Sequence, residues 1–197
     1  VVAAAAIYVF LLITGAPLAP LRAERGKLLL FGAIHGFIIL GYLLAIQYLT
    51  VASAVLLVYS SAIWIVVFAH FLLKEKVTGR TWLSLLIAFV GVVLVVGPQG
   101  LFIKSSLIGS LAGLLAGVGF GLVYALSKTF KTYDKVSLTF WQNLIAAPFV
   151  APLLFLGTVS FSAKDIAIVL LLGVVCTAVP FILVFRGFGK VSAHKGG

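Results

Sequence analysis

The chain has 197 residues, of which 63% are hydrophobic and only 9% are charged. A soluble globular domain carries about 25% charged residues, so this composition excludes a water-soluble fold and makes the lipid bilayer the solvent. The net charge of +10 does not indicate a nucleic-acid partner, because the basic residues stand in small clusters between long apolar runs rather than on one face.

Seven apolar segments follow one another along the chain. At about 1.5 Å per residue, helices of about 20 residues span the ~30 Å hydrocarbon core. The segments show no strand alternation, and helices satisfy every backbone group within lipid. The sequence therefore predicts an all-α integral membrane protein, a polytopic bundle of about seven transmembrane helices at residues 1–21, 28–48, 52–73, 81–98, 107–127, 137–157 and 165–186.

The first segment begins in the middle of an apolar run, and the sequence contains no methionine. No basic residues precede this segment, so a transmembrane helix is favoured over the apolar core of a signal peptide. We therefore expect the chain to be a fragment of a longer protein.

The connecting loops carry the charge. Alternate loops hold twelve basic residues, whereas the others hold two, Lys104 and Lys164. Loops rich in Lys and Arg stay in the cytoplasm, which predicts a multi-pass protein of the inner or plasma membrane with cytoplasmic loops at Arg22–Lys27, Lys74–Arg80 and Lys128–Lys135. All four acidic residues lie in loops or at helix ends, and Glu75 is expected to hold its neighbours Lys74 and Lys76.

An offset of 141 residues relates two parts of the chain. It places LFGAI (30–34) on LLGVV (171–175), TVA (50–52) on VSA (191–193), and 1–13 on 142–154. Five segments per repeat is an odd number, so the two copies cross the membrane in opposite directions. Such inverted repeats are typical of secondary transporters. The offset also predicts one further helix before Val1 and two after Gly197, which makes ten in all.

Several stretches carry a family resemblance. YLTVASAVLLVYSSAIWIVVFAHFLLKEKVTG (48–79) resembles the fourth helix and following loop of the drug/metabolite transporter superfamily, EamA type. IAFVGVVLVVGP (87–98) is similar to the next helix, GSLAGLLAGVGFGLVYALSK (109–128) to the helix that opens the second half, and FGKVSAHK (188–195) to the entry of the ninth helix. The resemblance implies two EamA-like repeats of five helices each, here residues 1–98 and 99–197.

One position departs from the family pattern. Family members commonly have proline about thirteen residues before the glutamate that ends the fourth helix, whereas this chain has Ala62. Without the proline, that helix lacks the usual cause of a kink.

Polar side chains inside the membrane must find a partner or line a cavity. His35 and Tyr42 are seven residues apart and share a helix face, and Ser60 and Trp64 share another. Cys176, Thr177 and Pro180 form a local weak point in the last segment. The residues predicted to line a solute cavity are His35, Tyr42, Tyr59, Ser60, Trp64, Gln142, Asn143 and Thr177.

Other readings of these residues stay open. Ser60 can bond within its own helix, and His70 is expected near the interface. Glycines 109, 113, 117 and 121 recur every four residues and predict close helix packing.

The sequence thus predicts transport, by export or exchange, of small organic solutes such as amino acids or other metabolites, through alternating access. Its partners are a small-molecule substrate and the bilayer, and a homodimer is left open. His35 is a candidate for proton coupling, although exchange and facilitated diffusion are equally open. No enzyme motif, metal site or cofactor site is visible. The alternative is a non-transporting membrane scaffold or sensor module.

Overall fold

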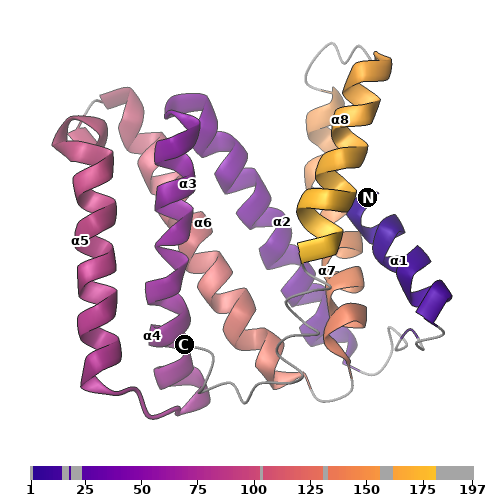
Figure 1. The fold of residues 1–197 in the computed structure, drawn as a ribbon, viewed down its shortest axis with the longest axis horizontal. Helices are drawn as coiled ribbons and strands as arrows, with labels where there is room; N and C mark the ends of the chain where they lie inside the picture. Colours follow the sequence, from indigo (N-terminus) through magenta and orange to yellow (C-terminus); the bar gives the residue numbers. More distant parts are fainter. Residues whose placement is uncertain are drawn as a thin grey trace. The chain divides into compact units, whose positions relative to one another are not determined.

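The computed structural model describes residues 2–14, 18, 24–102, 104–130, 133–155 and 162–180, and within these ranges every regular element is helical. The elements are drawn in Figure 1. They are, in chain order, α1 (Val2–Thr14), α2 (Arg25–Tyr48), α3 (Val51–Tyr59), α4 (Ser61–Leu73), α5 (Gly79–Phe102), α6 (Lys104–Thr129), α7 (Lys135–Val150), the 3₁₀ turn η1 (Ala151–Phe155), α8 (Ala163–Gly173) and the π-helical turn η2 (Val174–Ala178).

This order follows the seven predicted segments. The third segment is α3 with α4, the sixth is α7 with η1, and the seventh is α8 with η2, whose last predicted residues lie outside the described ranges. In the described part of the chain, four stretches are long and apolar enough to cross a bilayer: Arg25–Tyr48, Val51–Leu73, Leu107–Thr129 and Lys135–Leu153. Val2–Ile13 and Gly79–Gly91 are shorter apolar helices. The prediction of an all-α polytopic membrane protein is confirmed.

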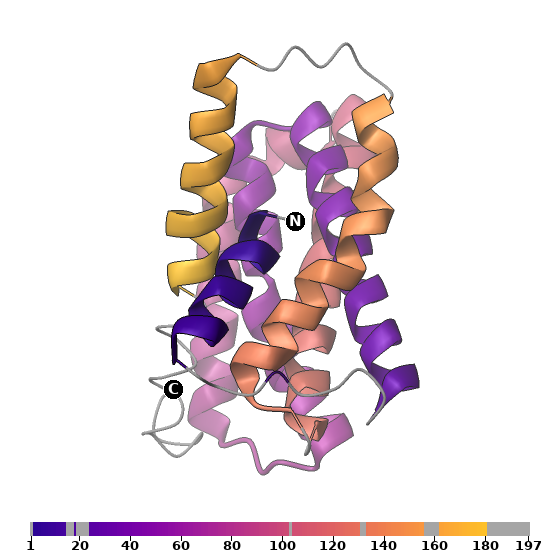
Figure 2. The same cartoon turned by 90° about the vertical axis from the view of Figure 1, so that its right-hand side faces the viewer.

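The chain divides into two compact units, which we call the first unit (Val1–Ala33 with Phe130–Gly197) and the second unit (Ile34–Thr129). In the first unit α1 packs against α7 and against α8 with η2 (Figure 2). Ala4, Ile7 and Leu11 of α1 form a core with Phe140 of α7. The units cut across the predicted repeats, because α1 belongs to the first repeat by sequence and packs on helices of the second.

In the second unit α6 packs closely against α3 and α4. A Cβ added at Gly113 would lie 3.1 Å from the Leu57 Cβ, and one added at Gly121 would lie 2.4 Å from the Trp64 Cβ. Gly117 is equally close to Leu57 and Ser60, whereas Gly109 is close to Tyr48 and Leu49 at the end of α2. We call this contact the glycine seam, made by Gly109, Gly113, Gly117 and Gly121. The close packing predicted for these glycines is therefore confirmed.

The third segment is interrupted at Ser60, although it contains no proline. The Ser60 N–H donates to the Leu57 carbonyl at 3.1 Å, and the Ile63 N–H donates to the Ser60 carbonyl at 3.0 Å. Both bonds span three residues, as in a 3₁₀ turn. A Cβ at Gly117 would lie 2.9 Å from the Leu57 carbonyl oxygen, so the glycine makes room for the turn. The helix is therefore interrupted at Ser60, two residues before Ala62, although this chain lacks the proline that family members commonly have at position 62.

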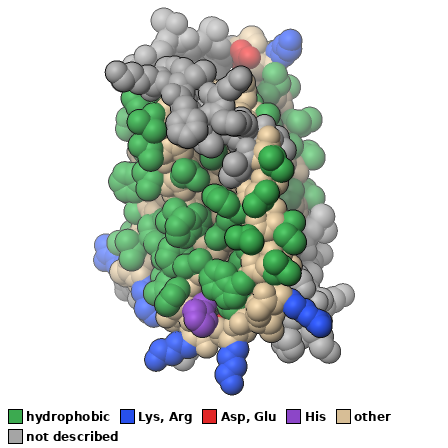
Figure 3. Space-filling model, turned by 90° about the vertical axis from the view of Figure 1, so that its left-hand side faces the viewer, with side chains coloured by type: hydrophobic (Ala, Val, Ile, Leu, Met, Phe, Trp, Pro, Cys, Tyr) green, Lys and Arg blue, Asp and Glu red, His purple; other side chains and the backbone are tan. Residues whose placement is uncertain are grey.

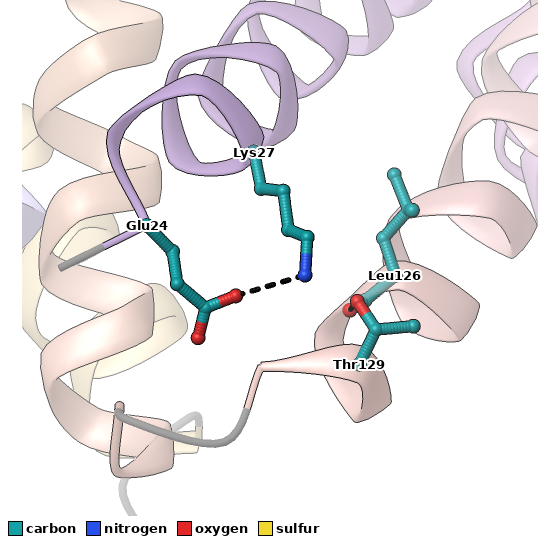
Figure 4. A network of polar contacts seen from close by, with 4 residues as sticks. All are labelled: Glu24, Lys27, Leu126 and Thr129. Atoms are coloured by element: carbon teal, nitrogen blue, oxygen red, sulfur yellow. Dashed lines mark hydrogen bonds and ion pairs between the residues drawn. The ribbon is translucent and has the colours of Figure 1, made fainter.

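The helix ends follow capping chemistry. Asp134 accepts from the N–H groups of Val136 and Ser137 at the start of α7, and Ser162 with Asp165 forms a capping box at the start of α8. At the start of α2, Lys27 pairs with Glu24 at 3.1 Å (Figure 4). The last residue of α6, Thr129, donates its hydroxyl hydrogen to the Leu126 carbonyl at 2.8 Å, as the same figure shows.

The acidic residue Glu75 has a different partner from the one expected. Its Oε1 binds Lys128 Nζ at 2.9 Å, across 53 residues of sequence, rather than Lys74 or Lys76. Lys74 instead ends α4 with a left-handed backbone, φ 54°. The pair joins the turn after α4 to the last turn of α6, because both lie at the same end of the second unit.

Candidate functional site

The structure divides the eight predicted site residues between the two units. His35, Tyr42, Tyr59, Ser60 and Trp64 lie in the second unit, whereas Gln142, Asn143 and Thr177 lie in the first. Within the second unit, four of these five residues line two separate hollows, one between α2, α3 and α6 and one between α4, α5 and α6.

The first hollow contains two tyrosines. It has a volume of about 210 Å³ and is lined by Ile38, Ile39, Tyr42, Val55, Val58, Tyr59 and Phe120. We call it the tyrosine pocket. Tyr42 is half-buried on α2, and Tyr59 is exposed at the last residue of α3. Tyr59 immediately precedes the interruption of the helix at Ser60.

His35 reaches this pocket through an aromatic contact. Its ring meets Phe120 edge to face, with the centroids 6.1 Å apart and the planes at 81°. The imidazole is buried, and its Nδ1 has no hydrogen-bond partner among the described residues. His35 therefore lies one ring behind the pocket wall, and Phe120 joins it to Tyr42 and Tyr59. Sequence reasoning missed Phe120, because an apolar side chain in an apolar helix carries no signal of its own.

The second hollow contains two tryptophans. It has a volume of about 440 Å³ and is lined by Ser60, Ile63, Trp64, Trp82, Leu85, Leu86, Phe89 and Leu114. We call it the tryptophan groove. Ser60 and Trp64 lie in it together, as their spacing of four residues predicted. Trp82 was missed, because near the end of an apolar segment it reads as an interfacial anchor.

Ser60 occupies an unusual position in the groove. Its side chain is buried, and its Oγ has no hydrogen-bond partner in the described part of the chain. The Oγ lies only 2.6 Å from where a Cβ on Gly117 would stand. The expectation that the Ser60 hydroxyl bonds within its own helix is therefore not met.

The polar residues of the first unit are held within their own helices. The Asn143 Nδ2 donates to the Thr139 carbonyl at 3.0 Å, and Gln142 is buried beside it on α7. The Thr177 hydroxyl donates to the Leu172 carbonyl at 3.0 Å inside the π-helical turn η2. Pro180 follows this turn, and its missing N–H accounts for a weak point there. A cavity role for these three residues stays a prediction.

The described residues offer little ionisable chemistry inside the spans. No group of three or more His, Cys, Asp or Glu side chains there is placed to hold a metal ion. The described acidic residues stand at helix ends, in caps or ion pairs. The chemistry available within the described spans is therefore mainly that of aromatic rings, hydroxyl groups, side-chain amides and the imidazoles of His35 and His70.

Comparison with known proteins identifies the family of the chain. Residues 1–97 and 107–197 match the model of the EamA-like transporter family. The chain belongs to the EamA-like transporter family. The family resemblance read from residues 48–79, 87–98 and 109–128 is thereby confirmed, and the chain is a multi-pass membrane protein of a transporter family.

Three curated relatives are similar to the chain, and each is named an uncharacterized transporter. One from Clostridium kluyveri is 28% identical over 160 residues, which cover 76% of this chain and 51% of the relative. One from Archaeoglobus fulgidus is 30% identical over 166 residues, covering 83% and 58%. YoaV of Bacillus subtilis is 24% identical over 155 residues, covering 76% and 53%. The chain thus spans about half the length of the curated relatives it matches, and no solved structure matches it significantly.

Proposed function

We propose that the protein carries small organic solutes, such as amino acids or other metabolites, across the membrane by alternating access, through export or exchange. The observation that carries the proposal is the tyrosine pocket, which lies between apolar helices of an EamA-family chain and contains two phenol groups. Phenol rings bind apolar and cationic groups on their faces and hydrogen-bonding groups at their hydroxyls. Amino acids and related metabolites combine both kinds of group.

The proposed mechanism uses two inverted repeats, residues 1–98 and 99–197. Two features support this division: the offset of 141 residues within the sequence, and the match of the family model to two separate stretches, 1–97 and 107–197. An odd number of helices per repeat gives the copies opposite orientations, as in many secondary transporters. Each orientation would then open the solute site to one side of the membrane in turn.

The helix break at Ser60 suits this mechanism. Discontinuous helices frequently form the binding sites of transporters, because the broken backbone frees polar groups near the solute. Here the break directly follows Tyr59, a residue of the pocket. We propose Tyr42 and Tyr59 as the solute contacts in the second unit, with Phe120 and His35 behind them.

The orientation of the second unit also forms part of the proposal. Lys74, Lys76, Arg80 and Lys128 lie at one end of the unit, where Glu75 joins the turn after α4 to α6. The excess of basic residues at this end favours the cytoplasmic side of the cell membrane.

The test is uptake into proteoliposomes against a panel of amino acids, nucleosides and sugars. We expect saturable uptake of at least one class, whose initial rate at low solute concentration Tyr59→Ala lowers about tenfold. The control is Phe71→Ala, which removes an exposed ring near the end of the same segment. A well-folded preparation that carries no solute of the panel would contradict the proposal and favour a scaffold or sensor module. Uptake that stays flat across pH 5–8 would remove His35 as a proton-coupling residue.

A further inference from the structure

Three basic side chains at one end of the second unit have no acidic partner. Lys74 and Lys76 lie in the turn between α4 and α5, and Arg80 lies in the first turn of α5. All three are exposed, and none forms an ion pair with a described residue. The acid in this turn, Glu75, is occupied by Lys128 at 2.9 Å. The turn therefore presents uncompensated positive charge.

The tryptophan groove begins within one helical turn of Arg80, the basic residue in the first turn of α5. On α5 its wall is formed by Trp82, Leu85, Leu86 and Phe89, and Trp82 stands only two residues after Arg80. From Trp82 to Phe89 the wall runs seven residues, or about 10 Å of helix. On α4 the wall is formed by Ile63 and Trp64, and Lys74 directly follows the last residue of that helix, Leu73. An apolar channel thus leads from mid-span to a cationic end.

The groove is open to the outside of the second unit. Trp82, Leu86 and Phe89 are exposed by 41%, 61% and 44%, which leaves the wall accessible from outside the helix bundle. Figure 3 shows the surrounding face, where hydrophobic side chains cover the helices and Lys and Arg gather at one end. Such a face meets acyl chains along its length and headgroups at its basic end.

We propose that the tryptophan groove binds an anionic phospholipid, whose acyl chain lies along Trp82–Phe89 and whose phosphate is held by Lys74, Lys76 and Arg80. Apolar side chains alone would accept any lipid. The three unpaired cations select a negative headgroup, since each basic residue near a membrane surface adds attraction for anionic lipid. This inference requires only that the chain spans a membrane, and it does not depend on the solute pocket.

The test is quenching of tryptophan fluorescence by lipids with brominated acyl chains. The full chain carrying Trp141→Phe keeps only Trp64 and Trp82, and both line the groove. In nanodiscs of phosphatidylcholine, brominated phosphatidylglycerol is titrated against brominated phosphatidylcholine. We expect phosphatidylglycerol to quench at a clearly lower mole fraction, and Trp82→Phe to remove most of the difference.

Charge variants decide whether the headgroup is recognised. Each of the three cations is neutralised in turn, and we expect each variant to lower the preference for phosphatidylglycerol about fivefold. The variants are Lys76→Gln, Arg80→Gln and Lys74→Asn, in which asparagine suits the left-handed backbone. The triple variant combines all three. Quenching by phosphatidylcholine should stay the same, which shows that each variant is folded. The control, Lys164→Gln, removes a lone exposed charge at the start of α8 and should leave the preference intact. Equal quenching by both lipids in the parent, or an unchanged preference in the triple variant, would overturn the proposal.

Discussion

The tyrosine pocket and the tryptophan groove, two hollows of the second unit, use the same helix, α6, in different ways. The tyrosine pocket takes Phe120 from α6 and is lined by the side chains of two tyrosines, and the Nδ1 of His35, one ring behind its wall, has no hydrogen-bond partner among the described residues. The tryptophan groove takes Leu114 from α6 and is lined by apolar side chains apart from the buried Ser60. We propose that the tyrosines favour solute in one hollow, and that the apolar rings near free cations favour lipid in the other.

The glycine seam explains why hollows form on either side of the contact between α6 and α3–α4. Within a bilayer, helices associate through van der Waals packing, so close contact requires small residues. Where α6 offers glycine, the backbones of the two segments approach closely. Beside these contacts, Tyr42 of α2 lines the tyrosine pocket, and Trp82 and Phe89 of α5 line the tryptophan groove. The seam is therefore the element on which both hollows depend.

The largest effect is expected from filling the seam. In Gly121→Ala the new Cβ would lie 2.4 Å from the Trp64 Cβ and 2.8 Å from its backbone carbon, so α4 must shift. We expect a loss of about 1–3 kcal/mol in the free energy of unfolding, measured by denaturant titration in detergent micelles. Gly91→Ala on α5 is the matched control, because its Cβ would meet nothing within 4 Å. Equal free energies of unfolding for the two variants would show that the close contact at the glycine seam does not contribute to stability.

A second change separates the two hollows by function. Tyr59→Ala removes a phenol from the tyrosine pocket, whereas Trp64→Ala removes a ring from the tryptophan groove. Loss of a hydrogen bond and a ring contact amounts to about tenfold in solute affinity. We expect Tyr59→Ala to lower the initial rate of uptake at low solute concentration by about that factor, and Trp64→Ala to retain most of it. The reverse order would exchange the roles of the two hollows.

A third change tests the polar group buried at the seam. Ser60→Ala removes a buried hydroxyl that lacks a partner, so we expect a gain of about 1 kcal/mol in stability. Gly117→Ala should cost less in this background, since the contact of 2.6 Å between the new Cβ and Ser60 Oγ disappears. The double-mutant cycle measures this coupling in the same titration. Additive effects would show that Ser60 and Gly117 do not touch.

The smallest effect concerns the ion pair at the basic end. Glu75 is 47% exposed and Lys128 26% exposed in their pair. Exposed pairs contribute between about 0 and 1 kcal/mol, so Glu75→Gln should lower stability by less than 1 kcal/mol and lose its effect at high salt. Glu75→Gln also leaves Lys128 free, which should strengthen the preference for phosphatidylglycerol. Stability that falls by several kcal/mol would show instead that the pair is buried.

The helices and the glycine seam were predictable because lipid imposes simple rules on a sequence. A span needs about 20 apolar residues, and glycines four apart on one face indicate close contact. The partners of individual polar groups were not predictable in the same way. Glu75 reaches Lys128 across 53 residues, a contact that only the packed helices create.

The packing of the helices also explains why the predicted site residues of the second unit are divided between two hollows. Tyr59 and Ser60 are neighbours in sequence, yet they line different hollows, because successive residues on a helix point in different directions. The helix break at Ser60 was also hidden, since it rests on Gly117 of another helix rather than on a local proline. The sequence thus identified the polar residues within the spans, and the packing decided which of them share a site.

The most direct measurement compares access to water in the two hollows. In a Cys176→Ala background, Tyr59→Cys and Leu86→Cys each place one thiol in the tyrosine pocket or the tryptophan groove. Both variants are treated in proteoliposomes with a water-soluble, membrane-impermeant thiol reagent. The account predicts rapid labelling at position 59, slowed by transported solute, and no labelling at position 86. Labelling at position 86 alone would contradict it, because water and solute would then enter through the groove assigned to lipid.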